Sequence, residues 1–331
     1  MSKKNILVTG CSGYIGSCLL NFFNPNQNIY GLDKKKPSNW VKIKKKNFYQ
    51  CNLLNKKKLS KILNKINPDL IVHLAAKSTV NEKIKNIDYL KNNFIATKNL
   101  ISTMNSLNIN KIIYSSTAAV YKKKNKLISE NDPLFPINKY GKTKLRAERV
   151  ILNNKNIKSI ILRFFNVSSA IKKPLIGELH EPETHLIPIA VSRAMNGKKI
   201  LINGNDYNTK DGTCIRDYIH IKDICRAIDK SINYLFQNKS SSTIFNIGNG
   251  KGLSNKEIIH QLQEVIQKKL IFEYTKRRKG DSAFLVCNIN KVKSKLKWRP
   301  LYSNIKNILK DDVYWNTYLI RKRIFRKLND K

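Results

Sequence analysis

Five short apolar runs alternate with helix-like segments through the first half of this 331-residue chain. The runs are rich in Ile, Val and Leu, and they cover residues 5–10, 28–33, 69–76, 111–117 and 159–166. Their nearly continuous hydrophobicity is typical of strands that are buried on both faces. Candidate helices lie between them, at residues 14–23, 56–66, 88–107 and 140–153. This alternation predicts an α/β fold with a doubly wound parallel sheet.

The regular alternation ends near Asn166. The rest of the chain contains candidate helices at 187–196 and 222–236, an apolar run at 243–248 and a Lys-rich tail. We therefore expect a first domain over residues 1–170, to which residues 217–248 return. Residues 171–216 and 249–331 are expected to form a smaller C-terminal lobe that completes a cleft.

The formal net charge is +42. If this charge were concentrated on one face, that face would favour binding to nucleic acid or to an anionic membrane. Here the lysines occur in almost every segment, in short runs at 34–36, 44–46, 56–58 and 122–124. Asn and Ile are also abundant, and all three residues have AT-rich codons. We interpret the charge as compositional bias on solvated faces, so no nucleic-acid partner is expected. A basic, non-enzymatic protein that binds a polyanion is a remote alternative.

The six cysteines show neither a CxxC pair nor metal-ligand spacing, and a chain of this size folds without disulfides. We therefore expect no metal site and a reduced, cytoplasmic location. The N-terminal apolar run is too short for a signal peptide, and no later stretch approaches the ~20 apolar residues of a membrane span. No membrane partner is expected.

A glycine-rich turn follows the first predicted strand. Gly10, Gly13 and Gly16 have the spacing GxxGxxG and lead directly into the first candidate helix. Glycines permit a close approach of the backbone to a pyrophosphate, whose charge is favoured by the N–H groups of a helix N-terminus. Asp33 ends the next predicted strand, where a carboxylate accepts hydrogen bonds from an adenosine ribose. An acid there repels a 2′-phosphate, so we expect NAD, although Lys34–Lys36 weaken the preference over NADP.

Tyr140 and Lys144 form a YxxxK pair at the start of a candidate helix, where residues four apart share a face. A neighbouring ammonium and a positive nicotinamide ring both stabilise a phenolate and lower the pKa of the tyrosine from its usual ~10. Tyr140 would then act as a general base. In a chain so rich in lysine, this spacing alone is weak evidence.

Upstream context strengthens the pair. The run "YSSTAAVY" contains Thr117 at the end of a predicted strand, 23 residues before Tyr140. With the glycine loop, Thr117 and YxxxK in this order, the chain resembles the extended members of the short-chain dehydrogenase/reductase superfamily. That resemblance implies a Rossmann-like fold, in which the hydroxyl of Thr117 hydrogen-bonds the reacting sugar oxygen.

From Asn5 to about Pro300 the chain resembles the UDP-glucose 4-epimerase family. The most specific evidence is residues 204–223, "GNDYNTKDGTCIRDYIHIKD", which is similar to that family's GxDYxTxDGTxxRDYIHVxD. "KRRKGD" resembles the family's RRxGD, and "RFFN" resembles its RYFN. The resemblance implies an NAD-binding first domain and a lobe that binds a nucleotide sugar.

The resemblance also implies the roles of individual residues. Tyr140, Lys144 and Thr117 would be catalytic. Tyr140 would take the 4-hydroxyl proton while hydride passes from C4 to tightly bound NAD, and hydride would return to the other face of a 4-keto sugar. NAD would be held by Gly10, Gly13, Tyr14, Ile15, Gly16, Asp33, Asn52, Leu53, Ala75, Ala76, Asn93, Ser115, Tyr140, Lys144 and Phe165. The UDP-sugar would be held by Thr117, Tyr140, Asn166, His185, Leu186, Arg216, Arg278 and Asp281.

The implied reaction interconverts UDP-glucose and UDP-galactose. Related 4,6-dehydratases need an Asp-Glu pair after the catalytic threonine, whereas this chain has Ala118 and Ala119, which perform no acid–base chemistry. A UDP-N-acetylglucosamine 4-epimerase, or a reductase of the same superfamily, is the alternative. Leu285 occupies the position linked in the family to acceptance of N-acetylated sugars, and its intermediate size leaves substrate breadth open.

Other positions depart from the family pattern. Asn52 replaces an Asp beside the adenine, and His185 replaces an Asn that contacts the diphosphate. Lys77 stands one position before the usual lysine, and Lys122 replaces a glycine. The resemblance further implies a homodimer that pairs the helices at 88–107 and 140–153, whose apolar residues include Leu90, Phe94, Leu100 and Ile101.

Overall fold

The chain divides into two units, each described here by itself. The computed structural model describes residues 3–23, 27–38, 41–79, 84–173, 175–180, 182–237, 242–278, 280–322 and 324. Unit 1 comprises 1–120, 136–164 and 225–245, and unit 2 comprises 121–135, 165–224 and 246–331. The segment 121–135, which we expected in the first domain, clusters with unit 2. It does so because Ile128 forms a bridge with Cys287 and accepts a 2.9 Å hydrogen bond from Asn246 Nδ2.

Unit 1 is built on a seven-stranded sheet with the order β12-β6-β5-β4-β1-β2-β3. Its strands are β1 (Asn5–Thr9), β2 (Asn28–Asp33), β3 (Phe48–Gln50), β4 (Leu70–His73), β5 (Lys111–Thr117), β6 (Lys158–Phe164) and β12 (Thr243–Ile247). From β3 to β6, each neighbouring pair is parallel. The predicted doubly wound α/β fold is confirmed, and the run at 243–248 does join this sheet. The strand order reverses between β1 and β4, and ligands bind at such a switch point in folds of this kind.

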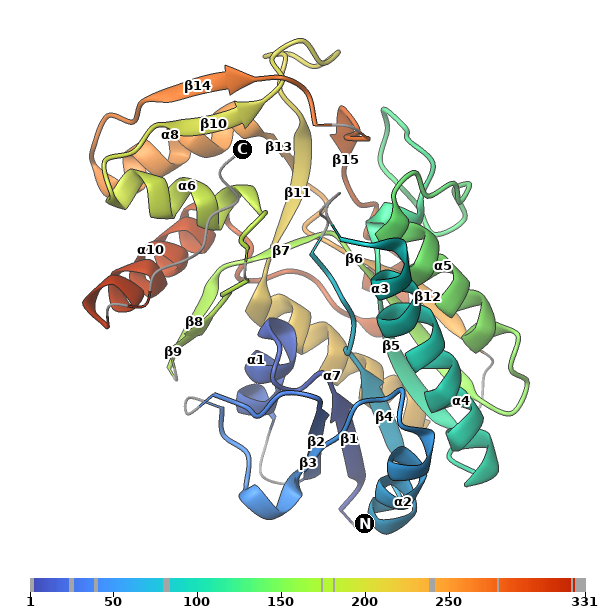
Figure 1. The fold of residues 1–331 in the computed structure, drawn as a ribbon. Helices are drawn as coiled ribbons and strands as arrows, with labels where there is room; N and C mark the ends of the chain where they lie inside the picture. The colour runs from blue at the N-terminus through green and yellow to red at the C-terminus, as the bar shows by residue number, and fades with distance from the viewer. Residues whose placement is uncertain are drawn as a thin grey trace. The chain divides into compact units, whose positions relative to one another are not determined.

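One face of this sheet is covered by three helices that pack together, α2, α4 and α5 (Figure 1). The helices near this sheet are α1 (Tyr14–Phe22), α2 (Lys56–Ile66), α3 (Asn86–Tyr89), α4 (Ala96–Ser106), α5 (Lys139–Leu152) and α7 (Ile221–Gln237). Apolar residues at helical spacing, such as Leu59, Leu63 and Leu100, meet strand residues such as Ile71 and Ile112 in one buried cluster. This cluster is the core beneath the catalytic candidates.

The predicted helix at 88–107 is not a continuous α-helix. It begins at Asn86, passes through a π-helical segment at Leu90–Ile95, and continues as α4 to Ser106. Sequence periodicity could not reveal the π-helical segment, because it shifts the helical register by a local change in hydrogen bonding. The segment turns Asn93 inward, where its side chain is 1% exposed.

A buried ion pair joins α5 to the sheet. Arg163 of β6 donates from Nη2 to Glu148 Oε2 at 2.7 Å and from Nε to Glu148 Oε1 at 3.1 Å. Ser116 of β5 also donates to Glu148 Oε1, and both charged side chains are 1% exposed. The bidentate geometry satisfies the charges in the protein interior. Glu148 lies on the same face of α5 as Tyr140 and Lys144, so the pair fixes the helix that carries both.

We predict that Arg163→Met destabilises the protein by about 3–5 kcal/mol, because it leaves Glu148 charged and buried without its partner. Urea denaturation, followed by circular dichroism, measures the change. The exposed Arg149→Met on the same helix is the matched control and should change stability by less than about 0.5 kcal/mol. The double variant Arg163→Met/Glu148→Leu should recover much of the loss, since it removes both charges. Equal stability of Arg163→Met and the control would refute a role for the ion pair.

Unit 2 contains smaller sheets, of which the four-stranded one is built around strand β11. Its strands are β7 (Asn166–Ser168), β8 (Ala170–Lys172), β9 (Leu175–Gly177), β10 (Ile200–Asn203), β11 (Ile215–His220), β13 (Gly252–Ser254), β14 (Phe272–Thr275) and β15 (Phe284–Leu285). Its helices include α6 (Leu186–Met195), α8 (Asn255–Ile266), α9 (Asn290–Leu296) and α10 (Ile305–Arg321). β11 pairs with β13, β15 and β7. A second core cluster joins α6, β10, α8 and α10.

Helices α8 and α10 were missed in the sequence, where this region was interpreted as a Lys-rich tail. Both carry signals that the lysines obscured. α8 begins with a capping box, in which Ser254 and Glu257 satisfy each other's backbone N–H groups. α10 buries Ile308, Trp315 and Leu319, which recur at helical spacing.

Two buried carboxylates from "RDYIHIKD" organise the loops of unit 2. Asp217 accepts backbone N–H groups from Asn249 at 2.6 Å, from Gly250 at 2.9 Å and from Cys287 at 3.1 Å. Burial nevertheless raises the pKa of Asp217 to about 6, and these hydrogen bonds oppose the rise. Asp223 accepts from the backbone of Leu301 at 2.9 Å, as well as from Tyr302 and Ser303. Much of this motif is therefore structural.

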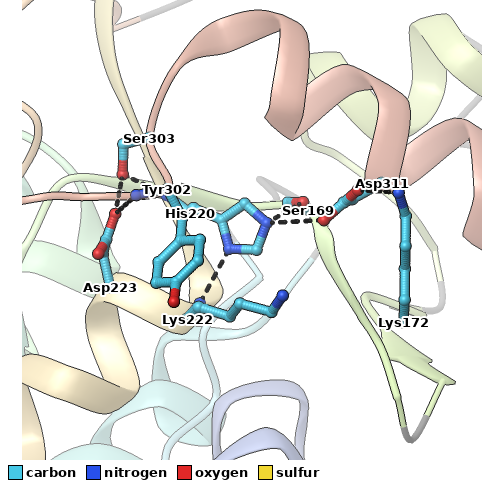
Figure 2. A network of polar contacts seen from close by, with 8 residues as sticks. All are labelled: Ser169, Lys172, His220, Lys222, Asp223, Tyr302, Ser303 and Asp311. Atoms are coloured by element: carbon cyan, nitrogen blue, oxygen red, sulfur yellow. Dashed lines mark hydrogen bonds and ion pairs between the residues drawn. The ribbon is translucent and has the colours of Figure 1, made fainter.

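Ser169 and Asp311 both lie on the Nε2 side of the His220 ring, as Figure 2 shows, so these residues do not form a hydrolytic triad. The Ser169 hydroxyl and the Asp311 carboxylate both face the same ring atom, Nε2, at 2.9 and 3.2 Å. In a triad they face opposite nitrogens. Here Nδ1 accepts the backbone N–H of Lys222 at 3.0 Å, so the network holds β11 to α10.

All six cysteines are free and buried, in agreement with the expectation that the chain folds without disulfides. Among the described residues, no helix is long and apolar enough to cross a membrane.

Candidate active site

The glycine loop between β1 and α1 depends on the absence of side chains. Gly10 has φ +74°, and a Cβ there would lie 2.5 Å from the backbone nitrogen of Ala75. A Cβ on Gly16 would lie 2.2 Å from the carbonyl oxygen of Gly10. Gly13 is the N-cap of α1 and provides no side-chain cap. The loop therefore forms a backbone cradle at the sheet's switch point, with a helix N-terminus suited to a phosphate.

Asp33 is held against this loop. Its carboxylate accepts the backbone N–H of Ser12 at 3.0 Å and that of Lys35 at 3.0 Å, which fixes its orientation at the end of β2. The ammonium of Lys34 contacts Asn92 Oδ1 at 3.0 Å. The predicted neighbourhood of Gly10, Asp33 and the β4 exit is thus present in unit 1.

Other predicted cofactor residues are occupied by contacts within the protein. Asn52 Oδ1 accepts the backbone N–H of Leu54 at 3.1 Å, so its side chain caps its own loop. Ser115 donates to the carbonyl oxygen of His73 at 3.2 Å. Leu53 is 5% exposed and belongs to the core beside α2.

Asn93 connects the exit of β4 to α5. Its Oδ1 accepts the Lys77 N–H at 2.7 Å, and its Nδ2 donates to the Lys77 carbonyl at 3.1 Å and to Thr143 Oγ1 at 3.2 Å. Both the oxygen and the nitrogen of the Asn93 amide make hydrogen bonds within the protein. Asn93 therefore orients the loop and the helix around the predicted cofactor site.

Thr117 and Tyr140 meet at the end of β5. The Thr117 side chain lies close to the Tyr140 phenol, and its hydroxyl accepts the backbone N–H of Ala119 at 3.1 Å. The close approach depends on Gly141, because a Cβ there would lie 2.4 Å from the Ala119 carbonyl oxygen. Asn138 caps α5 by accepting the Gly141 N–H at 2.7 Å. The structure thus brings together two residues that are far apart in sequence.

Lys144 lies one turn further along α5 and is 1% exposed. Its Nζ is 4.2 Å from the ring centroid of Tyr114. Burial lowers the pKa of Lys144 to about 7, and the charge of Glu148 opposes this shift. Tyr114 and Glu148 were not recognised in the sequence, because the strand and the helix that carry them give no sign of which residues face one another.

Burial also raises the pKa of Tyr140 to about 12, although the hydrogen bond with Thr117 opposes the rise. We expected the ammonium of Lys144 to lower this pKa. In the protein alone the pKa is raised instead, because burial has the largest effect and Lys144 is not among the groups that lower it. A further positive charge is needed to make the phenol acidic.

A second set of predicted residues meets in unit 2. Arg216 of β11 donates from Nη1 to the Ser282 carbonyl oxygen at 2.7 Å, and its Nη2 lies 3.5 Å from Asp281 Oδ1. Asp281 in turn donates its N–H to the Arg278 carbonyl oxygen at 3.1 Å. Leu285 pairs with Arg216 across the β11–β15 ladder. The "KRRKGD" turn therefore lies beside the arginine of the longest motif.

Phe165, which we predicted to contact the cofactor, and the remaining predicted substrate residues are also in unit 2. Phe165 is 5% exposed, and its N–H donates to the Ile247 carbonyl oxygen at 3.0 Å. Asn166 of β7 hydrogen-bonds the side chain of Tyr218 on β11. His185 is the N-cap of α6, directly before Leu186, and its Nδ1 lies 2.5 Å from Glu178 Oε1.

The sequence analysis missed a cluster that contains His185. Glu178, His180, Glu183 and His185 converge, and their potential ligand atoms all lie within 4.8 Å of one another. The signal was present in "GELHEPETH", which contains two Glu-x-His pairs. The search for metal-ligand spacing considered only the cysteines.

Comparison with known proteins identifies the family. The profile described as the NAD dependent epimerase/dehydratase family matches residues 6–248. The chain belongs to this family. A UDP-glucose 4-epimerase from Halalkalibacterium halodurans is 36% identical over 318 residues, which cover 94% of this chain and 95% of that protein.

Solved structures agree with this membership. The UDP-glucose 4-epimerase from Bifidobacterium longum, in complex with NAD+ and UDP, matches with a TM-score of 0.88 at 27% identity and covers 97% of this chain and 99% of that one. The UDP-Glc/GlcNAc 4-epimerase from Campylobacter jejuni matches with a TM-score of 0.80 at 35% identity and covers 95% and 99%. The resemblance to UDP-glucose 4-epimerases is confirmed.

We predict that the burial of Lys144 makes stability depend on pH. Its pKa is about 7 in the folded protein and 10.5 ordinarily, so the unfolded chain binds more protons between these values. The cost of burying Lys144 is therefore greater at pH 7 than at pH 9. The stability advantage of Lys144→Met over the unsubstituted protein should fall by about 2 kcal/mol between these pH values.

Urea denaturation at pH 7, 8 and 9 measures this difference. Tyr114, His73 and Glu148, which face Lys144, are the same in both proteins, so their titration largely cancels. Lys142→Met, exposed on the same helix, is the control and should show no such trend. A constant difference between Lys144→Met and the unsubstituted protein would contradict the lowered pKa.

Proposed function

We propose that this protein is a UDP-hexose 4-epimerase that interconverts UDP-glucose and UDP-galactose with tightly bound NAD. The observation that carries the proposal is the close approach of Thr117 and Tyr140, one helical turn from buried Lys144, in a chain 36% identical to a UDP-glucose 4-epimerase over nearly its whole length. A hydroxyl, a phenol and an ammonium in this arrangement suit reversible proton transfer at a sugar alcohol.

The residues of unit 1 fit a dinucleotide. The cradle around Gly10, in which a Cβ would collide with backbone, would present backbone N–H groups and the N-terminus of α1 to a pyrophosphate. Asp33, oriented by two backbone N–H groups, would accept hydrogen bonds from the adenosine ribose. NAD, when bound, supplies an acceptor for the C4 hydride and a positive charge beside the phenol.

Tyr140 would act as the base that accepts the proton of the 4-hydroxyl and later returns it. Its pKa of about 12 in the protein alone must fall for this role, and Lys144 contributes to the fall whenever it is protonated. Thr117 Oγ1, which lies close to Tyr140, would bind the reacting oxygen and keep it within reach. Ala118 and Ala119 offer no acid or base, which disfavours elimination of water from the sugar.

The nucleotide would be anchored in unit 2 while the sugar turns. Arg216 and Arg278 are proposed to bind the diphosphate, because a guanidinium matches phosphate oxygens in both charge and geometry. Asp281, near Arg216, would bind the uridine ribose. Asn166 and the His185–Leu186 start of α6 are proposed as further contacts of the nucleotide sugar, whereas Phe165 is proposed to contact the cofactor. Anchoring the nucleotide alone lets the 4-keto sugar present its other face.

We also propose a homodimer and a cytoplasmic location, which rest on family resemblance. Leu100 and Ile101, part of the apolar stripe expected at the dimer interface, pack in the core of their own sheet. Leu90 and Phe94 are half-buried and remain candidates for the interface. Light scattering on the purified protein measures its oligomeric state.

The direct test of function is incubation of purified protein with UDP-galactose, without added cofactor, and detection of C4 inversion by NMR. UDP-N-acetylgalactosamine in a parallel reaction tests substrate breadth, for which Leu285 beside Arg216 is a determinant. Inversion of neither substrate, in protein shown to contain NAD, would refute the proposal.

We predict that Tyr140→Phe lowers kcat by about 10²–10⁴-fold, because it removes the proton acceptor and leaves the ring in place. Cofactor retention, measured after denaturation and release, should be unchanged. Tyr234→Phe, a tyrosine outside the proposed site, is the matched control and should keep full activity. Full activity in Tyr140→Phe would eliminate it as the base.

We predict that Arg216→Ala raises KM for the UDP-sugar by about 10–100-fold, as expected when one charge-assisted contact worth about 1.5–3 kcal/mol is lost. NAD content should be unaffected, since Arg216 belongs to the nucleotide-sugar set. Arg193→Ala, whose guanidinium binds the Lys199 carbonyl at 2.8 Å, is the control. An unchanged KM would remove Arg216 from the binding site.

A further inference from the structure

A nine-residue stretch of unit 2 brings two of its three glutamates and both of its histidines together. It runs from Gly177, the end of β9, to His185, the N-cap of α6, and contains the pairs Glu178-Leu-His180 and Glu183-Thr-His185. Each residue offers one potential ligand atom, and the four atoms lie within 4.8 Å of one another. Neither the glycine loop nor the proton-transfer residues use this cluster, and His185 is its one member that is also proposed to contact the nucleotide sugar.

One carboxylate oxygen is approached by both imidazoles. Glu178 Oε1 lies 2.5 Å from His185 Nδ1 and 2.7 Å from His180 Nδ1. His185 Nδ1 also lies 3.5 Å from Glu183 Oε1. Both Nδ1 atoms and both carboxylates therefore face a common point, as the ligands of a single cation do.

The carboxylates are buried, and burying a charge is costly unless it is paired. Glu178 is 1% exposed and Glu183 is 0% exposed. Two ion pairs with protonated histidines are one way to neutralise them. Against that arrangement, His180 Nδ1 is buried and has no hydrogen-bond partner in the described part of the chain, although it lies 2.7 Å from Glu178 Oε1. A nitrogen close to a carboxylate, but not aligned to donate to it, is placed as a metal ligand would be.

We propose that Glu178, His180, Glu183 and His185 bind one divalent transition-metal ion of the zinc class. The ligands would be the Nδ1 atoms of the two histidines and one carboxylate oxygen from each glutamate. Zinc–nitrogen and zinc–oxygen bonds of about 2.0–2.2 Å in a tetrahedron place neighbouring ligand atoms about 3.3 Å apart. The observed separations reach that geometry with small movements of side chains.

The ligand set distinguishes among metals. Two imidazoles with two carboxylates suit zinc and its transition-metal neighbours, whereas Mg²⁺ and Ca²⁺ prefer oxygen ligands throughout. The two acids also offset the two charges of the ion, so the loaded site is neutral when both histidines are neutral. Four protein ligands complete a tetrahedron, which is typical of a structural site rather than a catalytic one.

Contacts behind the cluster hold it in shape. Glu183 Oε1 accepts the backbone N–H groups of Thr184 at 2.8 Å and His185 at 3.1 Å. Trp315 of α10 donates from Nε1 to the Glu178 carbonyl oxygen at 2.8 Å. The same indole packs on Gly177, where a Cβ would lie 2.5 Å from the ring. The ion would thus fasten the end of β9 and the start of α6 to α10.

The cluster is open enough for an ion to enter. The side chain of His185 is 45% exposed and that of His180 is 24% exposed, whereas the glutamates line the inner side. An exchangeable ion can therefore be removed and restored without unfolding the chain, which makes the proposal testable on the intact protein.

The test uses tag-free, full-length protein and measures bound metal by mass spectrometry. We expect about one zinc ion per chain after purification in zinc-supplemented medium. Protein stripped with a chelator should then take up Zn²⁺ with a stoichiometry of one in calorimetric titration, and its Tm should rise with Zn²⁺ but not with Mg²⁺ or Ca²⁺. Co²⁺ in place of Zn²⁺ should give the intense visible absorption of a four-coordinate ion.

Variants identify the ligands. His180→Asn and Glu183→Gln should each weaken Zn²⁺ binding by at least about 100-fold, since each removes a direct ligand. His260→Asn, an exposed histidine on α8, is the matched control and should bind Zn²⁺ as the unsubstituted protein does. Far-ultraviolet circular dichroism of each variant shows whether it is folded.

Two results would overturn the proposal. The first is that the stripped, folded protein does not bind Zn²⁺ saturably. This measurement uses the unsubstituted chain, so it is decisive even if the variants do not fold. The second is equal Zn²⁺ binding in His180→Asn and the control. Neither result depends on epimerase activity, so the metal site and the proposed function are tested independently.

Discussion

The buried pair of Arg163 and Glu148 is the interaction on which the arrangement of unit 1 depends. It fixes α5 to β6 through two hydrogen bonds in the protein interior, and Ser116 of β5 donates to the same carboxylate. Because Tyr140, Lys144 and Glu148 recur every four residues on that helix, fixing Glu148 also fixes the two catalytic candidates. The same burial shifts the pKa of Tyr140 upward and that of Lys144 downward. The protein alone therefore holds its proposed base protonated.

Unit 2 differs from unit 1 because many of its connections are loops. Asp217 and Asp223 each gather several loop donors around one buried carboxylate, which replaces the hydrogen bonds of a regular sheet. The sequence motif that contains them is the most specific one in the chain. Its specificity reflects this loop architecture as much as any contact with substrate, and Arg216 is the member whose guanidinium lies beside Asp281.

Sequence patterns predicted the strands and most helices of unit 1, since buried parallel strands have continuous apolar runs. They did not predict the features in which the tertiary structure departs from the local sequence pattern. The π-helical segment that turns Asn93 inward leaves no trace in the spacing of apolar residues. α10 was hidden by its lysines, although its buried face is regular. The Glu-His cluster was overlooked because only cysteines were examined as metal ligands.

The sequence by itself determined the parallel sheet, the glycine turn after β1 and the order of Thr117, Tyr140 and Lys144, because these depend on local propensity and fixed spacing. Only the tertiary structure decided that Thr117 meets Tyr140, that Glu148 pairs with Arg163, and that two Glu-x-His pairs converge. Those outcomes require residues from different elements to approach within hydrogen-bonding distance. Such distances, and the loss of water that shifts each pKa, are set by packing and cannot be derived from a linear pattern.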